Sequence, residues 1–378
     1  FEVEIEGVKL NLKKPVLYKY TDPVKGEIYQ PVVVVPPVNL KVSPSILLFK
    51  QGESITQTIT VTARANKDIS KATAEISASI GGTSLEKMQR ELSLQKGSVI
   101  NVPFSISSEM LKGNNTQLFI PEIKLSNGIA TKGSSLGMRT ISYDHIPELN
   151  YFYENNIKVL NIDLKTSGKR VGYIVGAGDK VPQALEQMGY EVIILNQNDI
   201  VPSVLSTLDA VITGVRAYNV HEYLSDKYEV LMEYVKNGGN LIVQYNTNTQ
   251  IGPVKAKIGP YDFTISRTRV TDENAPVQFL DPDHPVLNYP NKITQKDFEG
   301  WIQERGIYFA AQRAPEFKSV LSMNDPGESP SDGSLIIANY GKGTFVYTGL
   351  VFFRELPAGV PGAYRLMANL IALNQNKP

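Results

Sequence analysis

The chain has 378 residues, of which 42% are apolar and 20% charged, the composition of a folded protein with more than one core. Lys and Arg together number 38, as do Asp and Glu, so the formal net charge is zero. This balance argues against a nucleic-acid partner, because such proteins usually carry an excess of positive charge. With no Cys and only three His, we expect no disulfide, no metal centre and no cysteine nucleophile.

The longest apolar run covers residues 31–38 and is interrupted by prolines. A membrane-spanning helix needs roughly 18 apolar residues, so we expect no membrane span. The chain starts at Phe1 without a charged segment followed by an apolar one, the pattern of a signal peptide. We interpret this start as a cut, with an upstream part of the gene product removed.

The first 143 residues predict β-structure. Apolar and charged residues alternate over residues 1–12, as in a strand with one buried face. Further strand patterns, separated by turn-forming residues at sandwich-like intervals, cover residues 42–49, 54–63, 70–78, 98–106 and 117–125. We predict an immunoglobulin-like β-sandwich over residues 39–143, and we interpret residues 1–38 as a partial β region, the tail of another sandwich.

After Tyr143, short apolar strands alternate with amphipathic helices. The strand patterns cover residues 170–175, 191–195, 208–213, 240–244, 334–338 and 344–350, and the helical patterns cover residues 181–188, 227–236 and 363–373. This alternation predicts a parallel sheet with crossover helices. The expected fold is a three-layer α/β domain over residues 144–378, flavodoxin-like in type. Residues 246–334 are less regular and are interpreted as an insertion.

In an open parallel sheet, ligands bind beyond the carboxyl ends of the strands, and this rule selects the loops after residues 175, 195, 213 and 244. The second loop, residues 196–199, is polar but matches no motif. The first loop begins at Gly176 and reads GAGD. It departs from the dinucleotide fingerprint because Val181 stands where the third glycine would be. A plain tight turn is therefore favoured over a nucleotide site.

The third loop brings together Arg216, Tyr218, Asn219 and His221 at a strand end. Arg and Asn can bind a carboxylate or a sugar hydroxyl, and Tyr can stack on a sugar ring. The alternative, which we favour, is that Arg216 pairs with a local acid while His221 lies on the surface.

The fourth loop contains Gln244 and Asn246. No Ser or Cys stands at Gln244 or Tyr245, where we expect a strand to turn sharply into a helix and where a hydrolase would place its nucleophile. Thr247 is a poor candidate without a base beside it. These side chains either cap the sheet, which is the favoured interpretation, or hydrogen-bond a ligand.

Three further segments contain residues suited to a site. His284 lies in DPDHP, where a turn is favoured over a metal site, and the single Trp, Trp301, precedes Glu304 in a segment that suits either a core or a sugar. Arg354 follows a strand end, where it pairs with Glu355 or faces the cleft. No catalytic residue is named. The candidate ligand-binding cleft comprises Arg216, Tyr218, Asn219, His221, Gln244, Asn246, His284, Trp301, Glu304 and Arg354.

The stretches RVGYIVGAGD, LDAVITG, GGNLIVQYN and YGKGTFVYTGL resemble the class I glutamine amidotransferase-like fold, and within it the ThuA-like branch. Together with DPDHPVLNYPNKITQKDFEGWIQERGIYF, they make the chain similar to the C-terminal region of large Bacteroidetes-type PIG-L (LmbE-like) deacetylases. In that architecture a zinc-dependent N-acetylglucosaminyl deacetylase domain precedes sandwich domains and an amidotransferase-like domain. The resemblance covers essentially the whole chain. It implies an upstream deacetylase domain as partner and a periplasmic or cell-envelope location.

The departures from this family limit what the resemblance implies. The deacetylase motif His-Pro-Asp-Asp is absent, because the only His-Pro is His284-Pro285 and Val286 follows it. The amidotransferase fold normally uses a Cys nucleophile and a His-x-Glu near the C-terminus. This chain has no Cys, and its last strand leads into Phe353-Arg354-Glu355. Glutaminase chemistry is therefore excluded on residue type.

Three functions remain open. The leading one is a non-catalytic accessory region that binds carbohydrate or a protein partner for a parent hydrolase, with no cofactor. The second is a stand-alone hydrolase or lyase that uses His284 or His221 with Glu304 or Asp283. The third is a structural spacer or dimerisation module.

Overall fold

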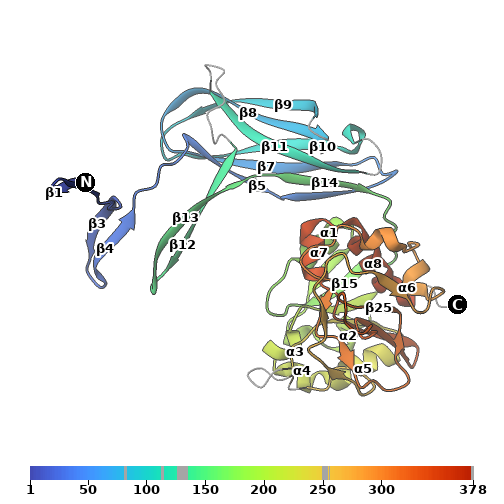
Figure 1. Ribbon diagram of the computed structural model, residues 1–378. Helices are drawn as coiled ribbons and strands as arrows, with labels where there is room; N and C mark the ends of the chain where they lie inside the picture. Colours follow the sequence, from blue (N-terminus) through green and yellow to red (C-terminus); the bar gives the residue numbers. More distant parts are fainter. Residues whose placement is uncertain (81–82, 112–114, 126–134, 249–253, 255, 376–378) are drawn as a thin grey trace. The chain divides into compact units, whose positions relative to one another are not determined.

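The structure is a computed structural model in which every residue is described except 81–82, 112–114, 126–134, 249–253, 255 and 376–378. Strands dominate the described chain and form several separate sheets (Figure 1). The chain divides into two compact units. The N-terminal unit comprises residues 1–47 and 54–159, and the C-terminal unit comprises residues 48–53 and 160–378. Within the described residues, we find no helix with the length and apolar character needed to cross a membrane.

Two sheets form a β-sandwich that belongs to the N-terminal unit except at the ends of two strands, residues 48–50 and 160–162, which are grouped with the C-terminal unit. One sheet has the order β10-β7-β5 and the other the order β6-β14-β11-β8-β9. The strands are β5 (Val38–Ser43), β6 (Ile46–Lys50), β7 (Thr56–Ala65), β8 (Ile69–Ile80), β9 (Thr83–Leu94), β10 (Val99–Ser107), β11 (Asn115–Leu125) and β14 (Ile157–Ile162), with a 3₁₀ turn η1 (Ser108–Met110) after β10.

Alternate side chains of the sandwich strands are buried, as a strand with one core-facing side requires. In β7, Ile59 and Val61 are buried, and they lie directly opposite Phe104 and Val102 of β10. In β8, Ala72, Ala74 and Ile76 are buried in the same period of two. The alternation seen in the sequence therefore forms the apolar core between the sheets.

Three features of this unit differ from expectation. The strand expected over residues 42–49 is two strands, because Pro44 interrupts it between β5 and β6. Strand β9 was not expected, since its charged residues hide any apolar alternation, and it pairs only with β8 at the sheet edge. The unit also extends past Tyr143 to Val159, because a hairpin of β12 (Leu136–Tyr143) and β13 (Ile146–Glu154) follows and β14 then joins the five-stranded sheet.

Residues 1–38 contain two hairpins, each paired as a separate two-stranded sheet. They are formed by β1 (Glu2–Ile5), β2 (Val8–Asn11), β3 (Leu17–Asp22) and β4 (Gly26–Pro31). Ile5 and Val8 face each other across the first hairpin and are 56% and 60% exposed. This apolar hairpin face is therefore left uncovered by the described chain.

The C-terminal unit is built on a seven-stranded sheet with the order β16-β15-β17-β18-β27-β26-β24. Its strands are β15 (Arg170–Ile174), β16 (Glu191–Ile194), β17 (Ala210–Thr213), β18 (Asn240–Gln244), β24 (Lys318–Ser319), β26 (Leu335–Tyr340) and β27 (Gly343–Thr348). The first five strands in this order are parallel. Strand β26 pairs antiparallel with β27, and β24 pairs antiparallel with β26. Apart from β24, which was not expected, these strands occupy nearly the residues expected from the sequence.

Helices lie on both faces of this sheet (Figure 1). Asn240 donates to the carbonyl of Leu370 in α8, whereas the next residue, Leu241, packs in the cluster that contains Leu231 of α5. Successive strand residues point to opposite faces, so α8 and α5 cover different sides. The helices are α1 (Val181–Gln187), α2 (Pro202–Leu205), α3 (Ala217–Val220), α4 (Tyr223–Asp226), α5 (Tyr228–Lys236), α6 (Pro285–Asn288), α7 (Phe352–Ala358) and α8 (Pro361–Ile371), with 3₁₀ turns η2 (Gln197–Asp199), η3 (Gln295–Phe298) and η4 (Ala372–Asn374).

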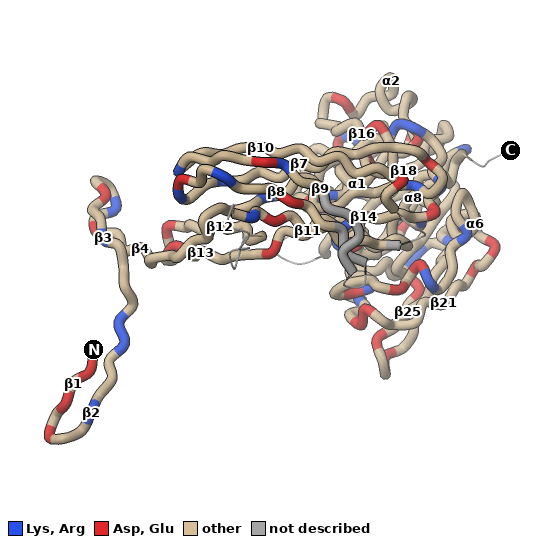
Figure 2. Tube along the Cα trace, turned by 90° about the horizontal axis from the view of Figure 1, so that it is seen from above, with Lys and Arg blue, Asp and Glu red and all other residues tan. Residues whose placement is uncertain are grey.

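The chain between β18 and β26 consists, where it is described, of short elements. Besides α6, η3 and β24 these are β19 (Thr264–Ile265), β20 (Arg269–Val270), β21 (Val277–Phe279), β22 (Gly306–Ile307), β23 (Ala310–Ala311) and β25 (Leu321–Met323). They pair as β19-β23, β20-β22 and β21-β25. Figure 2 shows acidic and basic residues interspersed along the chain, in keeping with its net charge of zero.

Candidate ligand-binding site

The loop after β15 is closed by contacts with the loop after β17. The amide of Ala177 donates to the carbonyl of Val215 at 2.8 Å, and a Cβ at Gly176 would overlap that same carbonyl oxygen. Asp179 accepts from the Tyr173 hydroxyl at 2.7 Å and from the Val215 amide at 3.3 Å. The crevice between these strands, where parallel sheets often bind nucleotides, is thus filled by the chain itself. The tight-turn interpretation of this loop fits the structure.

The sharp strand-to-helix turn follows β17, and not β18 as the sequence suggested. Arg216 occupies this turn with φ of 59°, in the left-handed region, and α3 begins at the next residue. Its amide donates to the carbonyl of Tyr245 at 2.8 Å, which joins the turn to the loop after β18. Hydrolases with a nucleophile elbow place their Ser or Cys in such a turn. A guanidinium cannot act as that nucleophile, so this turn is suited to binding.

The side chain of Arg216 lacks the acidic partner that we favoured from the sequence. Its Nε is buried and has no hydrogen-bond partner, and it forms no ion pair with any carboxylate of the described chain. Asp179, in the neighbouring loop, is occupied by three donors, including the amide of Val181. The expectation of a local ion pair was therefore wrong, and the charge of Arg216 is uncompensated.

Three aromatic rings lie next to this turn. The Tyr245 ring stacks on Tyr308, with centroids 5.6 Å apart and planes 13° apart, and lies 5.4 Å from the Phe353 ring. Tyr308 also has a left-handed backbone, with φ of 56°, and its carbonyl accepts a hydrogen bond from the buried Tyr347 hydroxyl at 2.7 Å. The rings come from the loop after β18, the segment after β22 and the start of α7. Tertiary packing therefore assembles them.

Arg354 completes the group on the side of α7. Its Nε lies 3.0 Å from Glu304 Oε1, it donates to the side chain of Gln303, and its guanidinium lies 4.9 Å from the Phe353 ring centroid. Glu304 is only 8% exposed, and its negative charge neutralises that of Arg354 through this ion pair. We call the whole set the carboxyl-edge cluster: Arg216, Tyr245, Gln303, Glu304, Tyr308, Phe353 and Arg354.

Both arginines lie close enough to Tyr245 for their positive charges to act on its hydroxyl. Burial raises the pKa of Tyr245, and the positive charges of Arg216 and Arg354 oppose that rise. The hydroxyl is therefore neutral at physiological pH and can donate or accept a hydrogen bond. The cluster offers one uncompensated cation, one balanced ion pair and a half-buried aromatic surface.

Backbone strain is concentrated in this cluster. The described chain has five non-glycine residues with positive φ, and three of them are Arg216, Gln303 and Tyr308. Left-handed conformations of such residues are costly and gather where function requires a particular side-chain position. Arg216 is distant in the chain from Gln303 and Tyr308, so their occurrence in one cluster marks this edge of the sheet as a candidate site.

Several residues expected to touch a ligand instead hold the loops together. The buried Tyr218 donates its amide to Asn246 Oδ1 at 2.9 Å. Asn219 exchanges two hydrogen bonds of 2.8 Å with the main chain of Thr247. Gln244 is buried and donates to the Tyr173 hydroxyl at 3.1 Å. These contacts fit the capping interpretation of the fourth loop.

The two histidines of this unit do not share a site. His221 Nε2 lies 2.7 Å from the Val175 carbonyl oxygen, and its ring lies 4.9 Å from that of Tyr223. His284 Nδ1 accepts from the Val286 amide at 3.2 Å, and burial lowers the pKa of His284. His284 lines a hollow of about 410 Å³ together with Thr344, near the start of β27. This hollow is at the amino edge of the parallel strands, opposite to Arg216.

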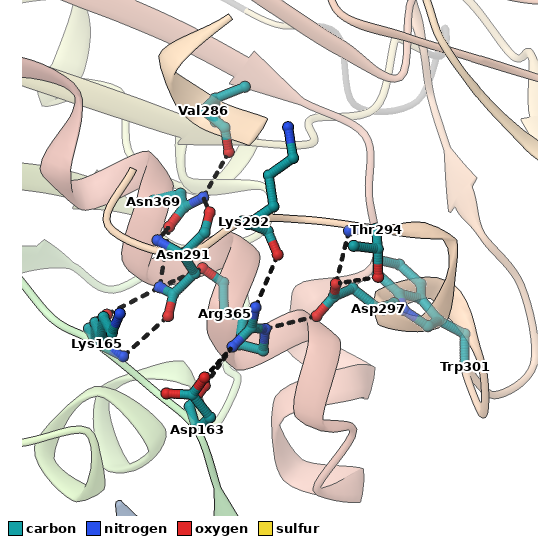
Figure 3. A network of polar contacts seen from close by, with 10 residues as sticks. All are labelled: Asp163, Lys165, Val286, Asn291, Lys292, Thr294, Asp297, Trp301, Arg365 and Asn369. Atoms are coloured by element: carbon teal, nitrogen blue, oxygen red, sulfur yellow. Dashed lines mark hydrogen bonds and ion pairs between the residues drawn. The ribbon is translucent and has the colours of Figure 1, made fainter. Parts of the chain in front are cut away.

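Trp301 belongs to the core. It lies next to Asp297 (Figure 3), whose carbonyl accepts a hydrogen bond of 2.9 Å from Trp301 Nε1. Its side chain is 2% exposed, and its ring stacks on Phe298. The same Asp297 carboxylate accepts from Arg365 of α8 at 2.7 Å. The interpretation of Trp301 as a sugar platform was therefore wrong.

Of the residues expected from the sequence, the cluster contains Arg216, Glu304 and Arg354. Four members of the cluster were not expected from the sequence, namely Tyr245, Gln303, Tyr308 and Phe353. Tyr245 could have been selected, since it directly follows the end of β18, whereas Phe353 lies in α7, five residues beyond the end of β27. No group of acidic and histidine side chains within the described part of the chain could hold a metal ion.

Comparisons with known proteins identify no family. No family model and no curated protein matches the chain. It is similar to a β-galactosidase from Rahnella sp. R3, with 15% identity and a TM-score of 0.32, over 57% of this chain and 32% of that one. It is also similar to the exo-β-1,4-mannosidase Op5Man5 from Opitutaceae bacterium strain TAV5, with 14% identity and a TM-score of 0.33, over 54% and 35%.

A third similarity is to the CARDB domain of the PF1109 protein from Pyrococcus furiosus, with 7% identity and a TM-score of 0.19, over 33% of this chain and 93% of that domain. The chain spans about a third of the length of the two glycosidases, 32% and 35%. At these TM-scores the similarities assign neither a fold nor a function to this chain.

Proposed function

We propose that the C-terminal unit is a non-catalytic saccharide-binding module and that the carboxyl-edge cluster is its binding site. The observation that carries this proposal is the uncompensated Arg216 guanidinium beside the rings of Tyr245, Tyr308 and Phe353. Aromatic faces pack against the apolar faces of sugar rings, while Arg, Glu and Gln side chains bind hydroxyl groups.

The strand order supports a flavodoxin-like, amidotransferase-like assignment of this unit. Numbered along the chain, the parallel strands β16, β15, β17, β18 and β27 have the order 2-1-3-4-5, which is the flavodoxin-like order. The antiparallel pair β26 and β24 extends this sheet at one edge. We propose an immunoglobulin-like type for the N-terminal sandwich on the basis of its two antiparallel-rich sheets.

The proposal extends to the parent protein. On the residues that resemble PIG-L (LmbE-like) deacetylases, we propose that the chain is the accessory region of such a hydrolase in the periplasm or cell envelope. The cluster would then hold a saccharide near an upstream deacetylase domain. The absence of Cys is compatible with that location.

A stand-alone hydrolase is less well supported. General acid-base catalysis needs a His and a carboxylate within hydrogen-bond reach, directly or through one water. His221 is bound to a main-chain carbonyl, and His284 lies at the opposite edge of the sheet from Glu304. A pure spacer would not require a strained, charged aromatic cluster.

Calorimetric titration with monosaccharides, including glucose and N-acetylglucosamine, tests the binding role. We expect dissociation constants of roughly millimolar order, weakened about tenfold or more in Tyr245→Ala, because the stacking surface is lost. The control is Tyr143→Ala, which removes a 62% exposed tyrosine from the N-terminal unit and should leave binding unchanged. No binding by the intact chain, or equal loss in both variants, would contradict the proposal.

A further inference from the structure

The charge balance of the carboxyl-edge cluster is uneven. Glu304 neutralises Arg354 through an ion pair of 3.0 Å, whereas Arg216 has no such partner among the described residues. Asp179 is the acid in the adjoining loop, and its carboxylate already accepts from one hydroxyl and two amides. One positive charge of the cluster is therefore left for a group outside the chain.

The position of Arg216 makes this imbalance costly. Its Nε is shielded from water without a hydrogen-bond partner, and a buried donor left unpaired destabilises the folded state, more so when it is charged. Its left-handed backbone adds a further cost. The turn is nevertheless fixed by two hydrogen bonds. The Arg216 amide donates to the Tyr245 carbonyl, and the Val215 amide donates to the Asp179 carboxylate. A group held in place at such cost is suited to a ligand that completes it.

We infer that the ligand of this cluster is an acidic saccharide, whose carboxylate binds the Arg216 guanidinium while its ring packs on the Tyr245 and Tyr308 rings. This inference rests on the proposed saccharide-binding function and specifies its ligand class. The guanidinium fork matches a carboxylate with two parallel hydrogen bonds, which a neutral hydroxyl cannot provide.

A pair of sugars that differ only at C6, which is a carboxylate in one and a hydroxymethyl group in the other, tests the inference. Sodium D-glucuronate and D-glucose are titrated separately into the full chain at low salt. We expect glucuronate to bind at least about tenfold more tightly than glucose, and its affinity to fall as salt is added. Acetate, which has the carboxylate but no ring, should bind far more weakly than glucuronate.

Variants at Arg216 assign the preference to this side chain. Arg216→Gln should lower the affinity for glucuronate far more than the affinity for glucose, and so abolish the preference, whereas Arg216→Lys, which keeps the charge but loses the fork, should retain part of it. The matched control is Arg170→Gln, which removes a positive charge at the amino end of β15 and should leave the preference intact. Emission from Trp301, the only Trp, verifies that each variant is folded.

The outcomes separate the two proposals. If glucose and glucuronate bind equally, or if the preference survives in Arg216→Gln, the acidic-ligand inference is overturned while the saccharide-binding proposal stands. If neither sugar binds the folded chain, both are overturned. Loss of the preference in Arg216→Gln but not in Arg170→Gln supports the inference.

Discussion

Single residues of the carboxyl-edge cluster combine unfavourable local conformations with useful positions. Arg216 and Tyr308 have positive φ although neither is glycine, and both are held by hydrogen bonds through their main-chain atoms. No sequence pattern reveals a left-handed Arg or Tyr, because the conformation is imposed by neighbours distant in the chain. The residue types at strand ends were visible in the sequence, but their strain and their missing partners were not.

Glu355 on α7 gives a prediction about pH. Its carboxylate is fully buried and accepts from the Ile302 amide at 3.1 Å. Burial raises its pKa from 4.5 to about 8, while the Ile302 amide and the charge of Arg305 oppose the rise. Between these values the folded chain binds the extra proton, so the stabilisation present below pH 4.5 is lost as pH rises through about 8. Glu355→Gln should flatten this fall, which we expect to be on the order of a few kcal/mol.

Urea unfolding of the C-terminal unit, followed by Trp301 fluorescence at about pH 5, 7 and 9, measures this effect. The difference between wild type and Glu355→Gln isolates one carboxylate from all others that titrate. Glu299→Gln, which alters an exposed acid in the same unit, serves as the control and should reproduce the wild-type slope. Parallel pH profiles for wild type and Glu355→Gln would show that this carboxylate does not titrate with folding.

At the level of elements, α8 is fastened to the irregular segment before Trp301 by buried amides (Figure 3). Asn369 Nδ2 donates to the carbonyls of Val286 and Asn291 at 2.8 and 2.7 Å, and its Oδ1 accepts from the Asn291 amide at 2.9 Å. Gly362 allows the helix to approach, because a Cβ there would overlap the Asp297 carbonyl. These contacts hold the segment that leads to Gln303 and Glu304 of the cluster.

Replacing Asn369 should therefore destabilise the C-terminal unit strongly. Asn369→Leu keeps a similar volume but leaves the Asn291 side chain and two carbonyls unpaired in the interior, at an expected cost of about 3 kcal/mol or more. Asn237→Leu, at an exposed position after α5, should change stability by less than about 0.5 kcal/mol. Urea midpoints read from Trp301 fluorescence compare the two, and similar midpoints would contradict the assigned role of Asn369.

The elements differ in how well the sequence predicts them. Buried parallel strands such as β17 and β18 are short continuous apolar runs, so their residues were expected nearly as observed. The edge strand β9 has too few apolar residues to be recognised. His284 and Glu304 both lie in the irregular segment, and only the packing of its short strands places them at opposite edges of the sheet. Sequence reasoning therefore identified part of the cluster and could not separate the two edges.

For the whole molecule, the C-terminal unit is made from two separate stretches of chain. Residues 48–53 belong to it, although residues 54–159 intervene before its main part begins. Leu48 and Phe49 are 1% and 0% exposed, and the Gln51 amide donates to the Ile162 carbonyl at 3.0 Å. The short stretch thus supplies both apolar burial and main-chain pairing.

A fragment of residues 160–378 should consequently unfold at a lower urea concentration than the same unit in the full chain. It lacks residues 48–53, and with them the main-chain hydrogen bond between the Gln51 amide and the Ile162 carbonyl. Deletion of residues 1–31, which removes only the two separate hairpins, should leave the transition seen by Trp301 unchanged. Equal midpoints for the fragment and the full chain would show that residues 48–53 contribute no stability to this unit.

The divided C-terminal unit also has a consequence for how the chain folds during synthesis. Residues 48–53 leave the ribosome long before residue 160, so their contacts require closure of a long loop, which is entropically costly. Strands β6 and β14 are neighbours in the five-stranded sheet, so formation of that sheet brings the two ends of the loop together. Formation of this sheet should therefore lower the entropic cost of joining residues 48–53 to the remainder of the C-terminal unit.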